Sequence, residues 1–173
     1  SVSNTQAFTG WGGRISDNMT AGQNPNGLIP MITSISGAQL FTAGQTTLPL
    51  AIANASTSLA GVLNPAGFGS PPTGSNLARL NAFNALRSQD LSSNYVAAAS
   101  HVTDLAMQAN NALQTFQEVT VTFPNTSIGN QLKQVARLIK KRLDLNVNRQ
   151  IFYVQIGGFD HHTDELTGQT NLF

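Results

Sequence analysis

The sequence predicts an α/β fold, and three observations along its 173 residues support this expectation. Short apolar segments separated by turn residues occupy much of the first half and indicate short strands. Apolar residues at helical spacing dominate the second half. Near the end, a helix, a turn, a hydrophobic strand and a polar loop follow one another, which is half of an α/β unit.

Composition excludes several classes of protein. Hydrophobic residues make up 40% of the chain, so disorder is not expected. Charged residues make up only 10%, against about 25% in an average domain, and the uncharged polar residues that replace them favour a non-cytoplasmic environment. The formal net charge of +1 gives no reason to expect a nucleic-acid or anionic-membrane partner. The absence of cysteine excludes disulfides and thiolate metal sites, and no apolar run approaches the roughly 18 residues of a membrane span.

The region 20–75 is predicted to be rich in strands and loops. Its apolar segments "LIPMITSI", "AQLFTAG", "TLPLAIAN" and "LAGVLN" are separated by Gly, Pro, Asn and Thr, which is typical of short strands joined by turns. Pro30 and Pro49 lie inside two of these segments and restrict them to edge or irregular strands. Residues 64–76 have the composition of a loop.

The region 76–145 is predicted to be mainly helical. Leu77, Leu80 and Phe83 are spaced for one helical face, and a longer helix is expected to follow Ser92 or Ser93, either of which can cap it. The alternating residues 119–123 ("VTVTF") suggest a short strand that ends at Pro124.

A third helix is expected from Ser127 to Leu143, with Thr126 or Ser127 as its cap. The apolar stripe predicted for its packing comprises Ile128, Leu132, Val135, Leu138, Ile139 and Leu143. Six of the nine basic residues lie between Lys133 and Arg149, and a solvated helix face explains them better than a nucleic-acid site.

The region 149–165 contains the candidate metal-site loop. A predicted buried strand, residues 150–156, is followed by Gly157 and Gly158, then by Asp160, His161 and His162. In an extended segment Asp160 and His162 point to the same side, and their oxygen and nitrogen atoms suit zinc, manganese or iron. Two ligands are an incomplete site, so the spacing alone leaves an ordinary polar turn as the leading alternative. The two glycines would let the backbone approach a substrate closely.

Two further features, Trp11 with Arg14 and the lone His101, have a simpler explanation than a functional site. Trp11, the only tryptophan, is followed one turn later by Arg14. The simpler explanation is a buried Trp that anchors a first helix, with Arg14 exposed. His101 lies within the predicted long helix, where a half-buried histidine is a better interpretation than a metal ligand.

Three motifs together resemble the bacterial domain-of-unknown-function family 1501. They are "TGWGGR" (9–14), "GNQLKQVARLIKK" (129–141) and "QIFYVQIGGFDHHTDE" (150–165). Members of that family typically show T-G-W-x-G-R, then G-x-Q-L-x-x-V-A-R-L-I, then V-F-Y-V-x-x-G-G-F-D-T-H, in the same order. His161 stands where the family usually has Thr, but the spacing of Asp160 and His162 is kept.

The resemblance implies an alkaline-phosphatase-like fold, in which helices flank a mostly parallel sheet. The chain would be one part of a single larger α/β domain, with a short-strand-rich insertion in its first half. Enzymes of that superfamily hold divalent metals at the carboxyl edge of the sheet and act on phosphate or sulfate esters. By this resemblance Asp160 and His162 are expected to bind a zinc, manganese, iron or calcium ion. Arg14, Gly157, Gly158 and His161 are the candidate substrate contacts.

The resemblance also implies export, because family members begin with a twin-arginine signal. Members are more than twice as long as this chain, so we expect a central fragment that has no activity alone and whose partner is the remainder of its parent chain. The expected substrate is a small-molecule or polysaccharide ester, and the protein is placed in the periplasm or outside the cell. The alternative is a non-catalytic exported protein for binding or surface assembly on the same fold.

Overall fold

Three short parallel strands form the centre of the molecule. The computed structural model describes residues 8–52, 55–62, 68–69, 71–115, 117–160, 163–170 and 172. Strand β1 is flanked by β2 on one side and by β3 on the other, and both pairings are parallel. The strands are β1 (Ile32–Ser34), β2 (Leu50–Ala51) and β3 (Ile151–Tyr153). The predicted α/β class is therefore confirmed.

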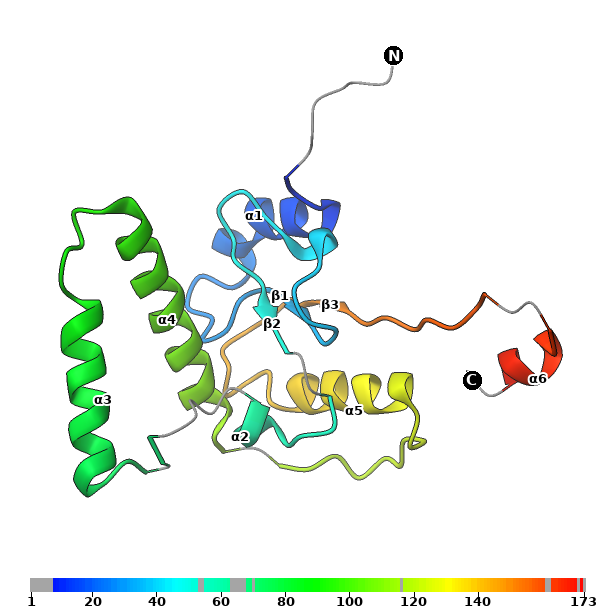
Figure 1. Cartoon of the computed structure of the whole chain (residues 1–173). Helices are drawn as coiled ribbons and strands as arrows, with labels where there is room; N and C mark the ends of the chain where they lie inside the picture. Colours follow the sequence, from blue (N-terminus) through cyan, green and yellow to red (C-terminus); the bar gives the residue numbers. More distant parts are fainter. Residues whose placement is uncertain are drawn as a thin grey trace, which may run out of the picture.

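Helices lie on both sides of this sheet (Figure 1). Helix α1 lies on one side and α5 on the other, while α3 and α4 run antiparallel beside the sheet. An extended segment leaves β3 and leads to α6, which stands apart from the rest of the molecule. The helices are α1 (Trp11–Gln23), the 3-10 helix η1 (Leu40–Thr42), α2 (Leu59–Val62), α3 (Gly74–Arg87), α4 (Asn94–Leu113), α5 (Ser127–Lys140) and α6 (Glu165–Thr170).

The apolar core lies between the sheet, α4 and α5. It brings together residues that are far apart in the sequence, and Leu138 is the fully buried contribution of α5. Burial of these side chains is the main favourable contribution to folding here. The buried members are Ile29, Ile35, Leu50, Ile52, Leu59, Ala109, Leu113, Leu138, Leu145 and Val147.

Glycines allow the start of α1 to pack directly against the η1 segment. A Cβ at Gly10 would lie 2.1 Å from the carbonyl oxygen of Leu40, and one at Gly13 would lie 2.1 Å from that of Ala43. The backbone N–H of Gly10 donates to Ala43 O at 2.8 Å. This backbone-to-backbone approach explains why small residues are needed around Trp11.

Asn24, at the end of α1, fixes the start of β3. Its Oδ1 atom accepts hydrogen bonds from the backbone N–H groups of Asn148 (2.8 Å) and Arg149 (3.1 Å), and its Nδ2 atom donates to Arg149 O. Asn24 is buried, so these bonds are made away from competing water. The first helix thus determines where the last strand enters the sheet.

The buried side of α5 is polar as well as apolar. Gln131, Gln134, Arg137 and Lys141 are all buried, together with Leu138. Gln134 Nε2 donates to Thr57 O at 2.8 Å, and Lys141 Nζ donates to Thr115 O. These long side chains are tolerated in the interior because each one has a partner.

Arg137 forms the strongest of these connections. Its Nε and Nη2 atoms donate to the two carboxylate oxygens of Glu118 at 2.9 and 2.5 Å, and its Nη1 atom donates to Gln134 Oε1 at 2.8 Å. A bidentate pair of this kind is more specific in geometry than a single contact. It attaches the segment between α4 and α5 to the middle of α5.

Several predictions for the helical region are confirmed. Helices occupy 74–87, 94–113 and 127–140, and Thr126 caps α5 through a bond from Gly129 N to its Oγ1 atom at 3.1 Å. Ser93 is the N-cap residue of α4, although its side chain makes no capping bond. The prediction for Pro49 holds, since β2 follows it at the edge of the sheet. The prediction for Pro30 is wrong, since the strand in its segment, β1, is central and buried and begins two residues after the proline.

Other predictions for individual segments are wrong. Residues 119–123 form no strand, because they lie along α5, largely exposed, and have no strand beside them. In the first half, part of "AQLFTAG" forms the 3-10 helix η1 and part of "LAGVLN" forms α2, where strands were predicted. Strand β3 is half-buried and not fully buried, because it lies at the edge of the sheet. His101 is exposed on α4 and not half-buried.

The predicted packing stripe of α5 is also wrong in part. Leu132, Ile139 and Leu143 are exposed, while Arg137 and Lys141, expected on a solvated face, are buried. Helical periodicity identifies residues that share a face, but the partners available to Arg137 and Lys141 decided which face turned inward.

Gly13→Ala tests the close packing of α1 on η1. The new methyl group would lie 2.1 Å from the carbonyl oxygen of Ala43, and we expect a loss of about 2 kcal/mol or more in the free energy of unfolding. Gly22→Ala is the matched control, since its Cβ would meet nothing within 4 Å and the helix should gain about 0.5–1 kcal/mol. Urea unfolding of both variants measures the difference, and equal stabilities would contradict this packing.

Acid should weaken the connection between Glu118 and α5. The hydrogen bond from Arg137 outweighs partial desolvation and lowers the pKa of the Glu118 carboxyl from 4.5 to about 2. A depressed pKa contributes stability above the unfolded value, and this contribution is lost as the pH falls from 4.5 towards 2. Because the carboxylate is half exposed, we expect the effect to be roughly 1 kcal/mol.

The measurement is the free energy of unfolding across this pH range. Glu118→Gln should be less stable than the wild type at neutral pH and should approach it near pH 2. Glu165→Gln, which removes a carboxylate far along the chain, controls for the change in net charge. A constant difference between Glu118→Gln and wild type at every pH would contradict the ion-pair explanation.

Candidate functional site

The carboxyl ends of all three strands meet at one edge of the sheet. Because β1, β2 and β3 are parallel, the segments that follow them leave the sheet on the same side. The amino-terminal end of α5 points towards this side as well (Figure 1). Open α/β sheets bind their ligands at such edges, which makes this the first place to look for a site.

Gln131 links α5 to the exit of β3. Its Nε2 atom donates to Gln155 O at 2.7 Å, and its Oε1 atom accepts from Gln155 N at 2.8 Å. The side-chain amide therefore pairs with the backbone of Gln155 as a neighbouring strand would. Gln131 is buried, so this pairing holds the segment after β3 against the first turns of the helix.

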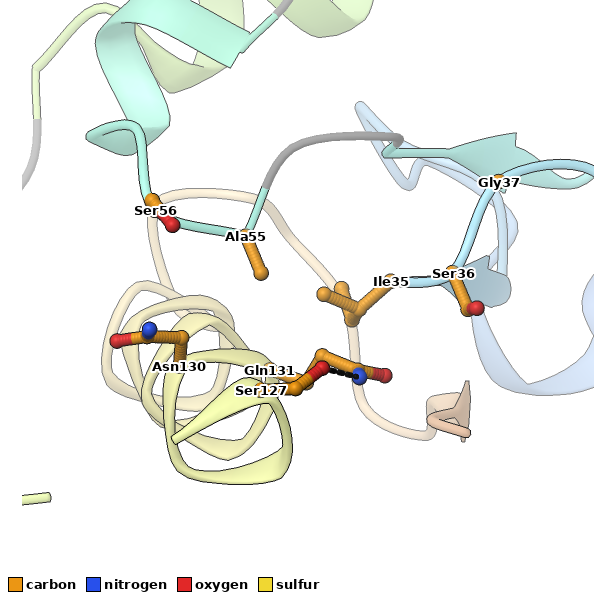
Figure 2. Close-up of a pocket in the computed structure, with 8 residues that line it drawn as sticks. All are labelled: Ile35, Ser36, Gly37, Ala55, Ser56, Ser127, Asn130 and Gln131. Atoms are coloured by element: carbon orange, nitrogen blue, oxygen red, sulfur yellow. Dashed lines mark hydrogen bonds between the residues drawn. The ribbon is translucent and has the colours of Figure 1, made fainter. Parts of the chain in front are cut away.

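A cavity of about 410 Å³ opens at this edge. Figure 2 shows one wall formed by Ala55 and Ser56, with Asn130 and Gln131 of α5 opposite and Ile35 beside them. The Ser36 hydroxyl lies 3.4 Å from Gln155 Oε1, which connects the cavity to the segment after β3. The lining residues are Ile35, Ser36, Gly37, Ala55, Ser56, Ser127, Asn130 and Gln131.

The lining of this cavity is polar but uncharged. Hydroxyl and amide groups can both donate and accept hydrogen bonds, so they can hold a polar ligand of either kind. The cavity also adjoins the first turn of a 14-residue helix, whose amino-terminal end favours negative charge. A small ligand that carries oxygen atoms fits this chemistry better than a cation.

Asp160 follows β3 in the extended segment that leaves the same edge. Gly158 has a φ of +91°, a backbone conformation that favours glycine, and Gly157 and Gly158 are both exposed. Asp160 is exposed too. His161 and His162 lie outside the described residues, so their predicted roles stay predictions. Within the described part of the chain, no cluster of three acidic, histidine or cysteine side chains forms a metal site.

Arg14 and Trp11 lie on α1, away from the lining of the cavity. The Arg14 Nη1 atom donates to Thr9 O at 2.9 Å, and Arg14 is exposed as predicted. Trp11 is 61% exposed, so the prediction of a buried Trp is wrong. Its ring meets Phe41 edge-on, with centroids 4.6 Å apart, because the glycines beside it bring the start of α1 close to η1.

Asp17 has a carboxylate with several hydrogen-bond partners, which the sequence did not indicate. Its carboxylate accepts hydrogen bonds from the backbone N–H groups of Gln45 (2.7 Å), Thr46 (3.1 Å) and Thr47 (2.7 Å). Partial desolvation opposes ionisation, but these bonds outweigh it and hold the pKa of the carboxyl far below its usual range. The fully paired carboxylate organises the loop before β2, which is a structural role.

The cavity residues were missed because no motif marks them. Ser36, Ser56, Ser127 and Asn130 are common surface residue types in a chain rich in Ser and Asn. The one usable signal was the group of polar residues around the cap of α5, since a helix start after a loop is a frequent place for ligands. Their meeting in space depends on the order of the strands.

Gln131→Ala tests the link between α5 and the exit of β3. Removal of the buried amide breaks both of its hydrogen bonds to the Gln155 backbone. At about 0.5–1.5 kcal/mol for each bond, we expect a loss of about 1–3 kcal/mol in the free energy of unfolding. Gln155→Ala is the matched control, since the two bonds use only the backbone of residue 155. Hydrogen exchange at Gln155 should quicken in the first variant alone, and unchanged protection there would contradict the link.

When the chain is compared with protein-family models, curated proteins and solved structures, none of them matches it. Among the described residues, no helix is both long enough and apolar enough to cross a lipid bilayer.

Proposed function

We propose that this chain is the central portion of an exported, metal-dependent hydrolase-like protein that acts on phosphate or sulfate esters. One observation carries the proposal: a polar cavity lies at the carboxyl edge of a parallel sheet, and the segment that leads to Asp160 leaves the sheet at the same edge. That edge is where α/β enzymes assemble their sites. An alkaline-phosphatase-like fold for the complete protein is part of the proposal, and the small parallel sheet between helices is the feature that supports it.

Asp160 and His162 are the proposed metal ligands. A carboxylate and an imidazole two residues apart fit zinc, manganese or iron, and carboxylate oxygen also fits calcium. When bound, such an ion would stabilise negative charge on a phosphoryl or sulfuryl group. Exposure of Asp160 fits a ligand completed by other parts of the protein.

The cavity is the proposed place for the ester group. The hydroxyl groups of Ser36 and Ser127 and the amide of Asn130 can donate to its oxygen atoms, and the start of α5 favours its negative charge. A Cβ at Gly157 would meet nothing within 4 Å, which leaves room there, whereas one at Gly158 would lie 3.3 Å from Leu172 Cδ2. Arg14 and His161 stay candidate substrate contacts; Arg14 would have to act from α1.

The three motif segments that suggest the resemblance make contacts around the sheet. In the α5 motif, Gly129 packs against Pro124 O, Gln131 holds the exit of β3, and Arg137 binds Glu118. In the first motif, Gly10 and Gly13 pack against the η1 segment. Each segment therefore contributes to the arrangement around the sheet.

The alternative, a non-catalytic exported protein for binding or surface assembly, has its own support. Large apolar side chains are exposed on several elements, including Trp11 on α1, Tyr95 on α4 and Leu166 on α6. Exposed aromatic and aliphatic groups of this size are typical of interaction surfaces. A protein that binds metal and hydrolyses an ester would be the hydrolase, whereas a protein without ester hydrolysis would be the non-catalytic alternative.

Metal content tests the proposal. After incubation with zinc, manganese, iron or calcium salts and desalting, we expect elemental analysis to find one of these ions bound to the chain or its parent protein. Asp160→Asn and His162→Ala should lose it. Asp164→Asn is the matched control, because it makes the same change in the same region and Asn tolerates the positive φ of 54° there.

The parent protein should also release the alcohol from an aryl phosphate or aryl sulfate. Bound metal without turnover would favour the non-catalytic alternative. Protein that holds none of the four ions, or an Asp160→Asn variant that keeps its ion, would contradict the metal site.

A further inference from the structure

Helix α5 presents much of its apolar face to solvent. Leu132 is 42% exposed, Ile139 is 47% exposed and Leu143, just beyond the helix, is 79% exposed. With the half-buried Ala136, they form what we call the α5 ridge: Leu132, Ala136, Ile139 and Leu143. An exposed apolar row along a helix is typical of an interaction surface.

The helix cannot turn this ridge inward without losing its buried hydrogen bonds. Gln131 holds Gln155, Gln134 holds Thr57 O, and Arg137 holds Glu118 from the opposite side of the helix. Rotation would leave these buried polar groups unsatisfied. The exposed position of the ridge is therefore a consequence of the fold.

The ridge has the spacing of a helix-packing seam. Its three residues within α5 are separated by four and three positions, as in the a/d pattern of a two-helix interface, and Leu143 follows in the turns beyond the helix. Ala136 in the middle allows close approach of a second helix. Within α5 (Ser127–Lys140) the seam runs from Leu132 to Ile139, a rise of about 11 Å.

The flanks of the ridge are positively charged. Lys133 and Lys140 follow Leu132 and Ile139 directly and therefore flank the seam within α5, and Arg142 precedes Leu143 in the turns beyond the helix. Lys140 and Arg142 are exposed, and Lys133 is partly exposed. A second copy of this chain would bring like charges together at these positions, whereas acidic residues would match them.

We propose that the α5 ridge docks an amphipathic helix of a partner protein, with an apolar seam and acidic flanks. A lipid surface fits less well, because the segment around Glu118 lies beside Lys140, whose Nζ atom donates to Glu118 O at 2.5 Å. That segment borders one side of the ridge, so a narrow helix can approach the ridge more easily than a flat membrane surface can. The docked helix would lie away from the side chains that hold the sheet together.

Two synthetic peptides test the proposal. Both have three heptads with Ile and Leu in the seam; one carries Glu at every flanking position and the other Lys. In fluorescence anisotropy titrations the Glu peptide should bind roughly tenfold or more tightly than the Lys peptide. Its affinity should fall as salt is raised, because the flanking charges are solvent-exposed.

Three variants assign the binding to the ridge. Leu132→Gln with Ile139→Gln should abolish it, while Val102→Gln, at a 50% exposed position of α4, should leave it unchanged. Lys133→Glu with Arg142→Glu should reverse the preference towards the Lys peptide. The changed positions are exposed or partly exposed, and thermal unfolding verifies that each variant is folded.

Several results would overturn the proposal. They are equal binding or no binding of the two peptides, and Glu-peptide binding that survives the double Gln variant. Sedimentation that shows a dimer lost in the double Gln variant would assign the ridge to a second copy. Binding to vesicles with anionic lipids, lost in that variant and not competed by the Glu peptide, would assign it to a membrane.

Discussion

The structure depends on the buried polar side of α5. Gln131, Gln134, Arg137 and Lys141 each bind a different part of the chain, respectively Gln155, Thr57, Glu118 and Thr115. A buried amide or charge without a partner costs more free energy than a lost surface contact, so these pairings constrain one another. The three described strands of the sheet are short, so few backbone hydrogen bonds join them. The side chains of α5 add hydrogen bonds that connect the helix to other parts of the chain.

Strand β3 shows how this constraint reaches the candidate site. Asn24 binds the backbone just before the strand, and Gln131 binds it just after. The strand is thereby fixed at both ends by side-chain amides from helices on opposite sides of the sheet. The direction in which the chain leaves towards Gly157 and Asp160 follows from these two residues and not from the loop itself.

The same constraint separates the two surfaces of α5 that matter for function. The start of the helix contributes Ser127, Asn130 and Gln131 to the cavity at the carboxyl edge. The ridge that begins at Leu132 faces solvent because the polar side faces the interior. One helix thus serves a proposed ligand site at its end and a proposed docking surface along its length, and a change to either can leave the other in place.

The sequence by itself determined the α/β class, the three long helices and the strand that follows α5, and it narrowed the cap of α5 to Thr126 or Ser127, because local spacing and capping report on neighbouring residues. It also singled out Asp160 at the exit of β3, while the roles of His161 and His162 stay predictions. Only the tertiary structure decided that Arg137 and Lys141 face inward and that Trp11 lies outside. It also decided that residues 119–123 form no strand and that Ser36, Ser56 and Asn130 share a cavity. The physical reason is that periodicity shows which residues share a face, whereas burial depends on partners such as Glu118 and Thr57 that are distant in the chain.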